Sequence, residues 1–387
     1  MISHVVLCGP ADPSAVFSNQ QNTTFPSASG GIPVNSLAKG LLNKGVRVTI
    51  VTTSMSVDKI WTHSQNLLTF YIVPQRQSAR ELTFDFFRSE RLGMIEVLKT
   101  LEFDLIHAHW TYEYALAAMK IKKPLLITAH DAPLTIFLLM LDPYRFFRLL
   151  MACAVRIRVK NISFVSSYIA ERWKKEMFWK SESPVIPNIA PIVAKARVVY
   201  RNDATNVLSI GSDNKIKNIR TLLLAWPYVL SKNPCAKLDL VGYGLGENSA
   251  LHNWATDMKL GESIRWHGFA DRNRVLELLA ATDILMHPSL EESFGLTLLE
   301  SMAFGIPIVA GKKSGAVPFI VKDAGILINI KDPTEIANAV VSLLAQKDIR
   351  ENLGQKGKKR VSQDFTMDRI VKAYMDEYQR IIETSND

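Results

Sequence analysis

Two glutamates with seven residues between them, Glu292 and Glu300, are the residues of this sequence best suited to bind a polar ligand. The apolar run 284–289 before them predicts a strand, and the residues from Phe294 onward predict a helix. Glu292 would then lie in the loop ahead of the helix, with Glu300 about two turns into it. A carboxylate can accept two hydroxyl hydrogen bonds at once, so each suits a diol. The alternative interpretation is a solvated acidic loop followed by one glutamate on a helix surface.

The start of this predicted helix is suited to bind an anion. An α-helix leaves its first backbone N–H groups without intrahelical partners, and its dipole places positive charge there. The groups in question belong to Phe294, Gly295, Leu296 and Thr297. A diphosphate fits such a terminus, and Gly295 lets it approach the backbone closely. If Glu300 holds ribose hydroxyls and Glu292 holds a sugar, the segment suits a nucleotide-sugar.

Short apolar runs alternate with helix-length segments along the whole chain, and the runs show little polar alternation. Strands that are buried on both faces of a parallel sheet have this pattern. The runs are 4–10, 46–52, 70–74, 104–110, 124–130, 161–167 and 184–188, then 206–212, 237–242, 263–269, 284–289, 306–310 and 325–329. The sequence therefore predicts an α/β protein with two Rossmann-like, doubly wound domains that face each other across a ligand-binding cleft.

The length of 387 residues is too great for one ordinary α/β core and suits two domains. Two prolines bracket the segment 187–191, which marks the predicted break. We expect an acceptor-binding domain over 1–190 and a nucleotide-sugar-binding domain over 191–365. The last segment, 366–387, is amphipathic and predicts a helix that packs back on the first domain.

Composition excludes several other classes of protein. Apolar residues make up 48% and charged residues 21%, which argues against disorder. The three cysteines, Cys8, Cys153 and Cys235, are far apart, so neither a disulfide scaffold nor a zinc site is expected. The first residues lack the pattern of a signal peptide. These features indicate a cytoplasmic protein.

Most of the net charge of +9 comes from the segment 133–180, which has nine Lys or Arg against three acidic residues. Large aromatic residues are mixed with these cations, as at the surface of an anionic membrane. Asp142 interrupts the longest apolar run well short of the about 20 residues that a spanning helix needs. The alternative is a pair of ordinary amphipathic helices. No nucleic-acid-binding motif accompanies the charge, so nucleic acid is not an expected partner.

The run from Pro288 to Pro307 resembles the E-x7-E signature of the retaining glycosyltransferases of family 4, which have the GT-B fold. The resemblance covers nearly the whole chain and is most specific in the second half. Further matching segments are Gly30-Gly31, 104–110, 126–131, 187–188, Gly211 with Lys217, 241–244 and 267–269.

The resemblance implies a role for individual residues. Glu300 would bind the ribose, and Glu292 would lie against the transferred sugar. Lys217 would neutralise the diphosphate, which leaves as an anion. The Gly31 backbone would touch the phosphates from the other domain, and His130 would lie near the donor sugar and acceptor.

Four further positions are weaker candidates: Gly30, His109, Ser212 and Phe269. His109 ends a predicted strand, like His130, and either histidine could be purely structural. Base recognition is expected near Phe269. Ser212 stands where family members commonly have an arginine, so Lys215 or Arg220 would have to replace that charge, or the donor is held more weakly.

The resemblance implies a retaining glycosyltransferase that needs neither a metal nor a cofactor, with a UDP- or GDP-linked sugar as its donor substrate. The expected acceptor is a lipid-linked or growing saccharide in cell-surface polysaccharide assembly. The protein would then lie peripherally on the inner face of the cell membrane. The alternatives are transfer to a soluble acceptor, a sugar-nucleotide 2-epimerase, and a weakly catalytic sugar-nucleotide-binding subunit.

Overall fold

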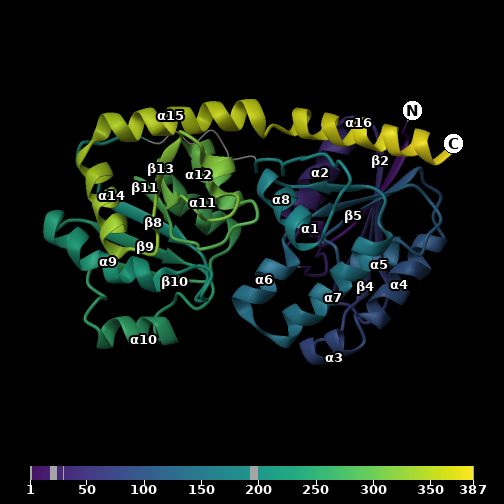
Figure 1. Cartoon of the computed structure of the whole chain (residues 1–387), viewed down its shortest axis with the longest axis horizontal. Coiled ribbons are helices and arrows are strands. Elements are labelled where there is room, and N and C mark those ends of the chain that lie inside the picture. The colour runs from purple at the N-terminus through teal and green to yellow at the C-terminus, as the bar shows by residue number, and fades with distance from the viewer. Residues whose placement is uncertain (1, 18–23, 29, 192–198, 387) are drawn as a thin grey trace. The chain divides into compact units, whose positions relative to one another are not determined.

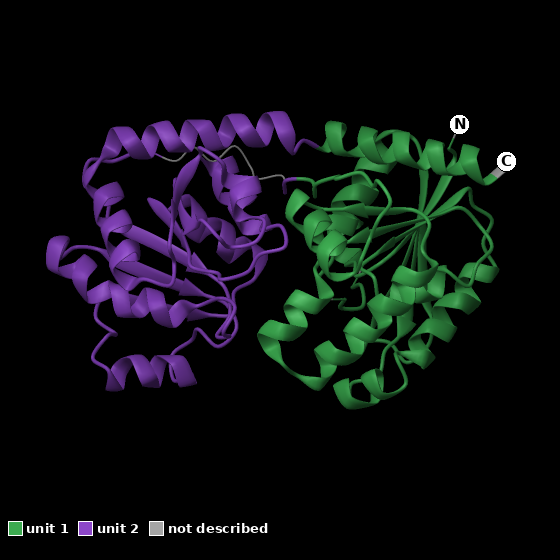
Figure 2. Ribbon diagram, viewed as in Figure 1, with its two compact units in different colours: residues 1–189, 367–387 green, residues 190–366 purple. Residues whose placement is uncertain are grey.

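The computed structural model describes residues 2–17, 24–28, 30–191 and 199–386 (Figure 1). The chain forms two compact units (Figure 2). Unit 1 consists of residues 1–189 and 367–387, and unit 2 of residues 190–366. These boundaries lie one residue from those expected from the sequence. The assignment of the acceptor to unit 1 and the donor to unit 2 stays a prediction.

Unit 1 is built on a seven-stranded sheet with the order β3-β4-β2-β1-β5-β6-β7. All neighbouring strands are parallel except β3, which is antiparallel to β4. The strands are β1 (His4–Cys8), β2 (Arg47–Ser54), β3 (Trp61–Gln65), β4 (Leu68–Pro74), β5 (Leu105–His109), β6 (Leu125–Ala129) and β7 (Ile162–Phe164). The helices are α1 (Pro13–Val16), α2 (Ile32–Asn43), α3 (Ala79–Phe84), α4 (Arg88–Lys99), α5 (Glu113–Ala118), α6 (Pro133–Met140), α7 (Pro143–Arg158), α8 (Ser167–Glu176) and α16 (Met367–Asn386).

Unit 2 has a six-stranded parallel sheet with the order β10-β9-β8-β11-β12-β13. The strands are β8 (Asn206–Ile210), β9 (Lys237–Val241), β10 (Ile264–Gly268), β11 (Ile284–His287), β12 (Ile308–Gly311) and β13 (Gly325–Ile328). The helices are α9 (Ile219–Lys232), α10 (Ala250–Asp257), α11 (Arg272–Ala280), α12 (Leu296–Phe304), α13 (Val317–Val321), α14 (Pro333–Ala345) and α15 (Lys347–Asp364).

Both sheets follow the doubly wound order in which the third, second and first strands are followed by the fourth, fifth and sixth, once the antiparallel β3 is set aside. The prediction of an α/β protein with two such sheets is confirmed. Helices cover both faces of each sheet, which is why the inner strands such as β1, β5, β11 and β12 are almost continuously buried.

Two strand predictions were wrong. The run 184–188 forms no strand, and only Val185 pairs with Phe164, as an isolated bridge. The edge strand β3 was missed because Trp61–Gln65 is largely polar and exposed, whereas the prediction relied on apolar runs. An antiparallel strand at the edge of a sheet can face water and needs no such run.

The last helix, α16, packs on α2 within unit 1. Gly40 of α2 leaves room for it, since a Cβ at that position would come within 2.3 Å of Val371 Cγ2. Lys44 Nζ lies 2.8 Å from Asp368 Oδ1 at the same contact. No helix within the described residues is both long enough and apolar enough to cross a membrane.

Candidate functional site

The loop between β11 and α12 places Glu292 beside the start of a helix. The helix begins at Leu296, so the prediction that it starts at Phe294 was wrong. Gly295 adopts a left-handed conformation with φ 90°, which breaks the helix before it. A Cβ on Gly295 would lie 2.8 Å from Leu298 Cδ1 and 3.2 Å from Glu292 Cγ, and the positive φ itself favours glycine at this position. The first-turn N–H groups are therefore those of Leu296 and Thr297.

The side chain of Phe294 packs in the core of unit 2. It is buried, and its ring lies edge-on to Phe365, with 6.1 Å between centroids. The aromatic pair holds the loop against the end of α15. The predicted role of the Phe294 backbone N–H in binding an anion stays a prediction.

Glu292 forms an ion pair with Lys217, which lies in the loop that follows the neighbouring strand β8. Lys217 Nζ donates to Glu292 Oε2 at 3.0 Å, and His287 Nε2 lies 3.4 Å from the same oxygen. Burial raises the pKa of the Glu292 carboxyl, but Lys217 and His287 together outweigh it and hold the pKa at about 2. Glu292 is therefore an anion throughout the neutral pH range.

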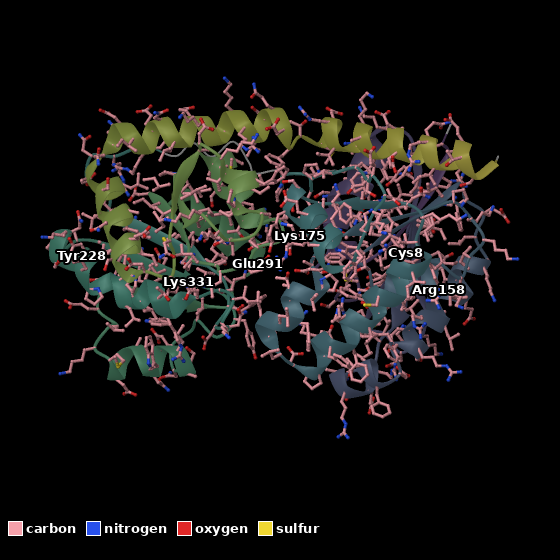
Figure 3. All side chains as sticks on the ribbon, in the orientation of Figure 1. Cys8, Arg158, Lys175, Tyr228, Glu291 and Lys331 are labelled. Atoms are coloured by element: carbon pink, nitrogen blue, oxygen red, sulfur yellow. The ribbon has the colours of Figure 1, made fainter. Side chains whose placement is uncertain are left out.

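The two loops that carry this ion pair are tied together by their backbones. Leu290 N donates to Ile216 O at 2.7 Å, and Asn218 Nδ2 donates to Pro288 O at 3.2 Å. The parallel strands β8 and β11 are neighbours, so the loops at their carboxyl ends meet at the same edge of the sheet. Figure 3 labels Glu291, the residue next to Glu292, at this edge.

Glu300 is buried on α12, and Arg272 Nη1 of α11 donates to its Oε1. Burial raises the pKa of Glu300 above its ordinary value, and Arg272 opposes that rise without cancelling it. No sequence pattern pointed to Arg272. It is the first residue of α11, and its carboxylate partner lies 28 residues further along the chain.

The remaining candidates in unit 2 lie around the same loops. Ser212 Oγ accepts a hydrogen bond from Asn214 Nδ2 at 2.7 Å. The Arg220 guanidinium lies 4.7 Å from the centre of the Trp254 ring, which directs it toward α10. The Phe269 side chain is 82% exposed and free to contact a ligand. Of the two proposed replacements for the family's arginine, Lys215 is exposed and Arg220 is held against a ring.

In unit 1, Gly30 and Gly31 form the turn that starts α2, with φ angles of 83° and 84°. A Cβ on Gly31 would lie 2.1 Å from Pro10 O, so no other residue fits this position. The turn places the N-terminus of α2 next to Pro10, which follows β1 closely in the chain. This geometry suits an approach of phosphate to the backbone.

His109 and His130 contact each other at the carboxyl ends of β5 and β6. His109 Nδ1 lies 2.9 Å from His130 Nε2, and the Trp110 ring stacks on His130 with 4.2 Å between centroids. His107 lies two residues before His109 in β5. It contacts Tyr378 Oη of α16 and Thr128 Oγ1, each at 2.7 Å. His109 Nε2 is buried without a hydrogen-bond partner among the described residues.

Burial is the main cause of the low pKa of all three histidines, and it lowers the pKa of His109 to about 3. The neighbouring histidines lower the pKa of His107 and His130 further. The three side chains are therefore neutral in the folded protein at neutral pH. A neutral imidazole at His130 can accept a proton or a hydrogen bond.

These histidines predict a loss of stability in mild acid. Below about pH 6.5, the unfolded chain binds protons at the three side chains while the folded chain does not. Stability is then independent of these groups above about pH 6.5 and falls below it, by about 1.4 kcal/mol per pH unit for each histidine. Urea unfolding at pH 7.5, 6.5 and 5.5 measures the slope, and His107→Gln should reduce it by up to about 1.4 kcal/mol per pH unit. Equal stability at all three pH values would contradict the assignment.

The structure brings Lys217, Glu292, Gly295, Leu296 and Thr297 together in unit 2, with Glu300 further along α12. It brings His109 and His130 together in unit 1. Their roles in binding and catalysis stay predictions. In the part of the chain that the structure describes, no group of three or more His, Cys, Asp or Glu side chains is arranged to hold a metal ion. Whether the reaction needs a metal is a separate question, and metal independence also stays a prediction.

Comparison with known proteins matches both halves of the chain to glycosyltransferase families. A family described as "Glycosyltransferase Family 4" matches residues 33–191, and "Glycosyl transferases group 1" matches residues 194–360. The N-acetyl-alpha-D-glucosaminyl L-malate synthase of Bacillus anthracis is 23% identical over 93% of this chain and 96% of its own. The lipopolysaccharide core biosynthesis glycosyltransferase LpsE of Rhizobium meliloti is 31% identical over 54% of this chain and 60% of its own.

Among solved structures, sucrose-phosphate synthase from Thermosynechococcus elongatus has a similar fold, with a TM-score of 0.80 and 19% identity. The match covers 99% of this chain and 100% of that one. The two family matches together extend over both units of the chain. The chain belongs to the family 4 glycosyltransferases and has their GT-B fold.

Proposed function

We propose that this glycosyltransferase moves a sugar from a UDP- or GDP-linked donor to a lipid-linked or growing saccharide, with retention of anomeric configuration, in cell-surface polysaccharide assembly. The observation that carries the donor assignment is the Lys217–Glu292 pair beside the first turn of α12. It offers a cation, an anion and free N–H groups at one edge of the sheet of unit 2.

The groups at this edge suit a reaction in which charge separates. The bond between the sugar carbon and the phosphate oxygen breaks, and its electron pair stays on the diphosphate. Lys217 and the N–H groups of Leu296 and Thr297 would stabilise that negative charge. Glu292, held as an anion, cannot serve as a general acid at neutral pH but can accept hydrogen bonds from sugar hydroxyls.

Retention needs no protein nucleophile in this proposal. The acceptor oxygen bonds to the sugar carbon on the face from which the diphosphate leaves, and the departing phosphate oxygen takes the acceptor's proton. Alternatively, Glu292 stabilises the positive charge that develops on the sugar ring. The neutral His130 would lie near the donor sugar and accept a hydrogen bond from a hydroxyl.

A thermal-shift screen of the purified protein against UDP-, GDP- and ADP-sugars tests the donor. One sugar nucleotide should raise the Tm clearly, because a ligand that binds only the folded state stabilises it. The anomeric configuration of the product, measured by NMR, then tests retention. An inverted product would overturn the proposed mechanism. If none of the sugar nucleotides raises the Tm, the result would count against the proposed donor site.

A soluble acceptor is the second candidate, and one observation favours it. One relative that matches nearly the whole chain has L-malate in its name, whereas the relative named for lipopolysaccharide core biosynthesis matches only about half. Transfer to small hydroxy acids or polyols without membrane or lipid would favour the soluble acceptor. Transfer only to a lipid-linked saccharide extract would favour the first proposal.

The proposed membrane surface, residues 133–180, is made by fewer residues than the sequence indicated. Trp173 and Trp179 are buried, and Arg148 lies inside, 3.5 Å from Glu113 and 3.7 Å from the centre of the Tyr112 ring. These three side chains therefore stabilise unit 1 and cannot contact a membrane. Large hydrophobic side chains that remain exposed are Leu138, Leu141, Phe146, Leu150, Ile157 and Phe178.

Cations accompany this exposed apolar set. Lys174 and Lys175 on α8 and Lys180 beyond it are exposed, and Lys175 is labelled in Figure 3. Exposed apolar side chains and exposed lysines in the same segment suit a bilayer interface that contains anionic lipids. The protein would then lie peripherally on the cytoplasmic face of the cell membrane.

The triple variant Leu141→Ser, Phe146→Ser and Phe178→Ser should weaken binding to phosphatidylglycerol-containing vesicles by at least about tenfold, because it removes apolar side chains that would enter the interface. Cosedimentation measures the bound fraction. The matched control is Leu224→Ser with Tyr228→Ser, which removes exposed side chains from α9 in unit 2. If the triple variant binds vesicles as the wild type does, this surface does not contact the membrane.

A further inference from the structure

Unit 1 contains a pocket that shares no residue with the Glu292 site or with the histidine pair. It has a volume of about 410 Å³, within the range of about 300–1,000 Å³ that is usual for small-ligand sites. Helices α4, α5 and α7 and the turn before α4 form it (Figure 1). The apolar side chains that line it are Phe86, Leu116, Met119, Leu150, Met151 and Ala154.

Three cations complete the lining: Arg91, Lys120 and Arg158. Arg91 Nε donates to Phe86 O at 2.8 Å, and Arg158 Nη1 donates to Ala154 O at 3.0 Å, so both guanidinium groups contact backbone carbonyls. No carboxylate of the described residues lies within 4.0 Å of any of the three. Arg158 lies at the end of α7 (Figure 3).

The backbone is strained at the turn before α4, which forms one wall of the pocket. Phe86 and Phe87 are consecutive residues with φ angles of 56° and 58°, a conformation that side chains with a Cβ rarely adopt. The Arg91 contact with Phe86 O and the edge-on packing of Phe86 on Phe147, with 5.6 Å between centroids, fix this turn. Burial also lowers the pKa of Arg91, and the nearby carboxylates of Asp85 and Glu90, which pair with Arg76, oppose that fall only in part.

The positive charge continues beyond the pocket. A second hollow of about 380 Å³ shares Met119 and Arg158 with the first, and Lys122 and Lys160 also line it. Cations at this density attract anions from solution. An anionic head group at the pocket mouth would therefore be favoured over a neutral one.

We propose that the pocket binds a single anionic amphiphile, with an aliphatic chain between the apolar walls and a phosphate head group against Arg91, Lys120 and Arg158. Apolar walls favour the chain because its burial removes hydrocarbon surface from water. Arginine binds phosphate through paired N–H donors, and the lysine adds a point charge. No carboxylate of the described residues forms an ion pair with these three cations, so the phosphate would be their direct charge partner.

Isothermal titration with dodecyl phosphate, below its critical micelle concentration and without any sugar nucleotide, tests this site independently of the transfer reaction. Dodecyl phosphate should bind at least about tenfold more tightly than dodecyl maltoside, which has a neutral head, and than inorganic phosphate, which has no chain. Equal binding of dodecyl maltoside would overturn the role of the cations. Equal binding of inorganic phosphate would overturn the role of the apolar walls.

Variants then locate the site. The double variant Lys120→Gln and Arg158→Gln removes two exposed cations and should weaken dodecyl phosphate binding by at least about tenfold. Ala154→Leu narrows the pocket from α7 and should weaken it without a change of charge. Lys99→Gln, an exposed lysine on α4 that does not line the pocket, is the matched control. Wild-type affinity in both pocket variants, or an equal loss in Lys99→Gln, would place the amphiphile elsewhere.

Discussion

The variant Lys217→Gln is expected to have a kcat about 10²–10³-fold below that of the wild type, the range seen when one transition-state stabiliser is removed. Lys217 Nζ is the cation that contacts Glu292, and in the proposed reaction it also faces the leaving diphosphate. Glutamine removes its charge and keeps a polar side chain. Release of free nucleotide from the donor, with and without acceptor, measures the effect.

An exposed lysine elsewhere in unit 2 provides the control. Lys237 lies at the amino end of β9, whereas Lys217 follows the carboxyl end of β8, and Lys237→Gln removes the same charge. It should retain wild-type kcat, and Lys217→Arg should recover part of the activity because it restores a cation. Equal losses in Lys237→Gln and Lys217→Gln would indicate a general effect of charge and refute a specific role for Lys217.

A pH profile separates a chemical role from a structural one. In the wild type, Lys217 and His287 outweigh burial and hold the pKa of Glu292 at about 2. Without Lys217, burial would raise that pKa, and Glu292 would take up a proton at higher pH than in the wild type. The residual activity of Lys217→Gln should therefore fall in acid where that of the wild type does not. A profile that keeps its shape would mean that Glu292 does not act as an anion in the reaction.

The second large effect is expected for Glu300→Gln, which should weaken donor binding by at least about tenfold, or about 1.4 kcal/mol. The buried carboxylate offers two acceptor oxygens to a ribose diol, whereas an amide offers one. The substitution also removes the charge partner of Arg272. The dissociation constant of the stabilising sugar nucleotide, measured by titration, gives the result.

Two further variants interpret that result. Glu277→Gln removes an exposed glutamate from α11 that pairs with Arg274 at 2.8 Å, and it should bind the donor as the wild type does. Arg272→Gln leaves burial to raise the pKa of Glu300 without opposition, so donor binding should become weaker as the pH falls. Wild-type affinity in Glu300→Gln would remove Glu300 from the donor site.

The positions of the strands and the loop that carries the glutamates were predictable because they depend on local pattern. Continuous apolar runs mark parallel strands that are buried on both faces, and all but one of the predicted runs form strands. The order of strand, loop and helix around Glu292 and Glu300 followed from the same local pattern. The helix starts two residues later than predicted because Gly295 adopts a left-handed conformation, which local pattern did not indicate.

The composition of 133–180 predicted a membrane surface of cations and aromatic side chains. Only some of these side chains are exposed in the folded protein. A count of cations and aromatic residues in the sequence does not distinguish buried side chains from exposed ones. Folding buries Trp173 and Trp179 and places Arg148 between Glu113 and Tyr112, so these side chains contribute packing and compensated charge instead of surface. Burial depends on which helices cover the sheet, and composition carries no information on that.

The sequence by itself determined the fold class, the strand positions and the residue types available for donor binding. The tertiary structure alone decided which charges meet: Lys217 and Glu292 are 75 residues apart, and Arg272 and Glu300 are 28 apart. The same holds for the contact between His109 and His130. The physical reason is that local pattern fixes the secondary structure. The order of strands in a sheet and the turns at their carboxyl ends set the distances between charged groups, and those distances set their pKa values.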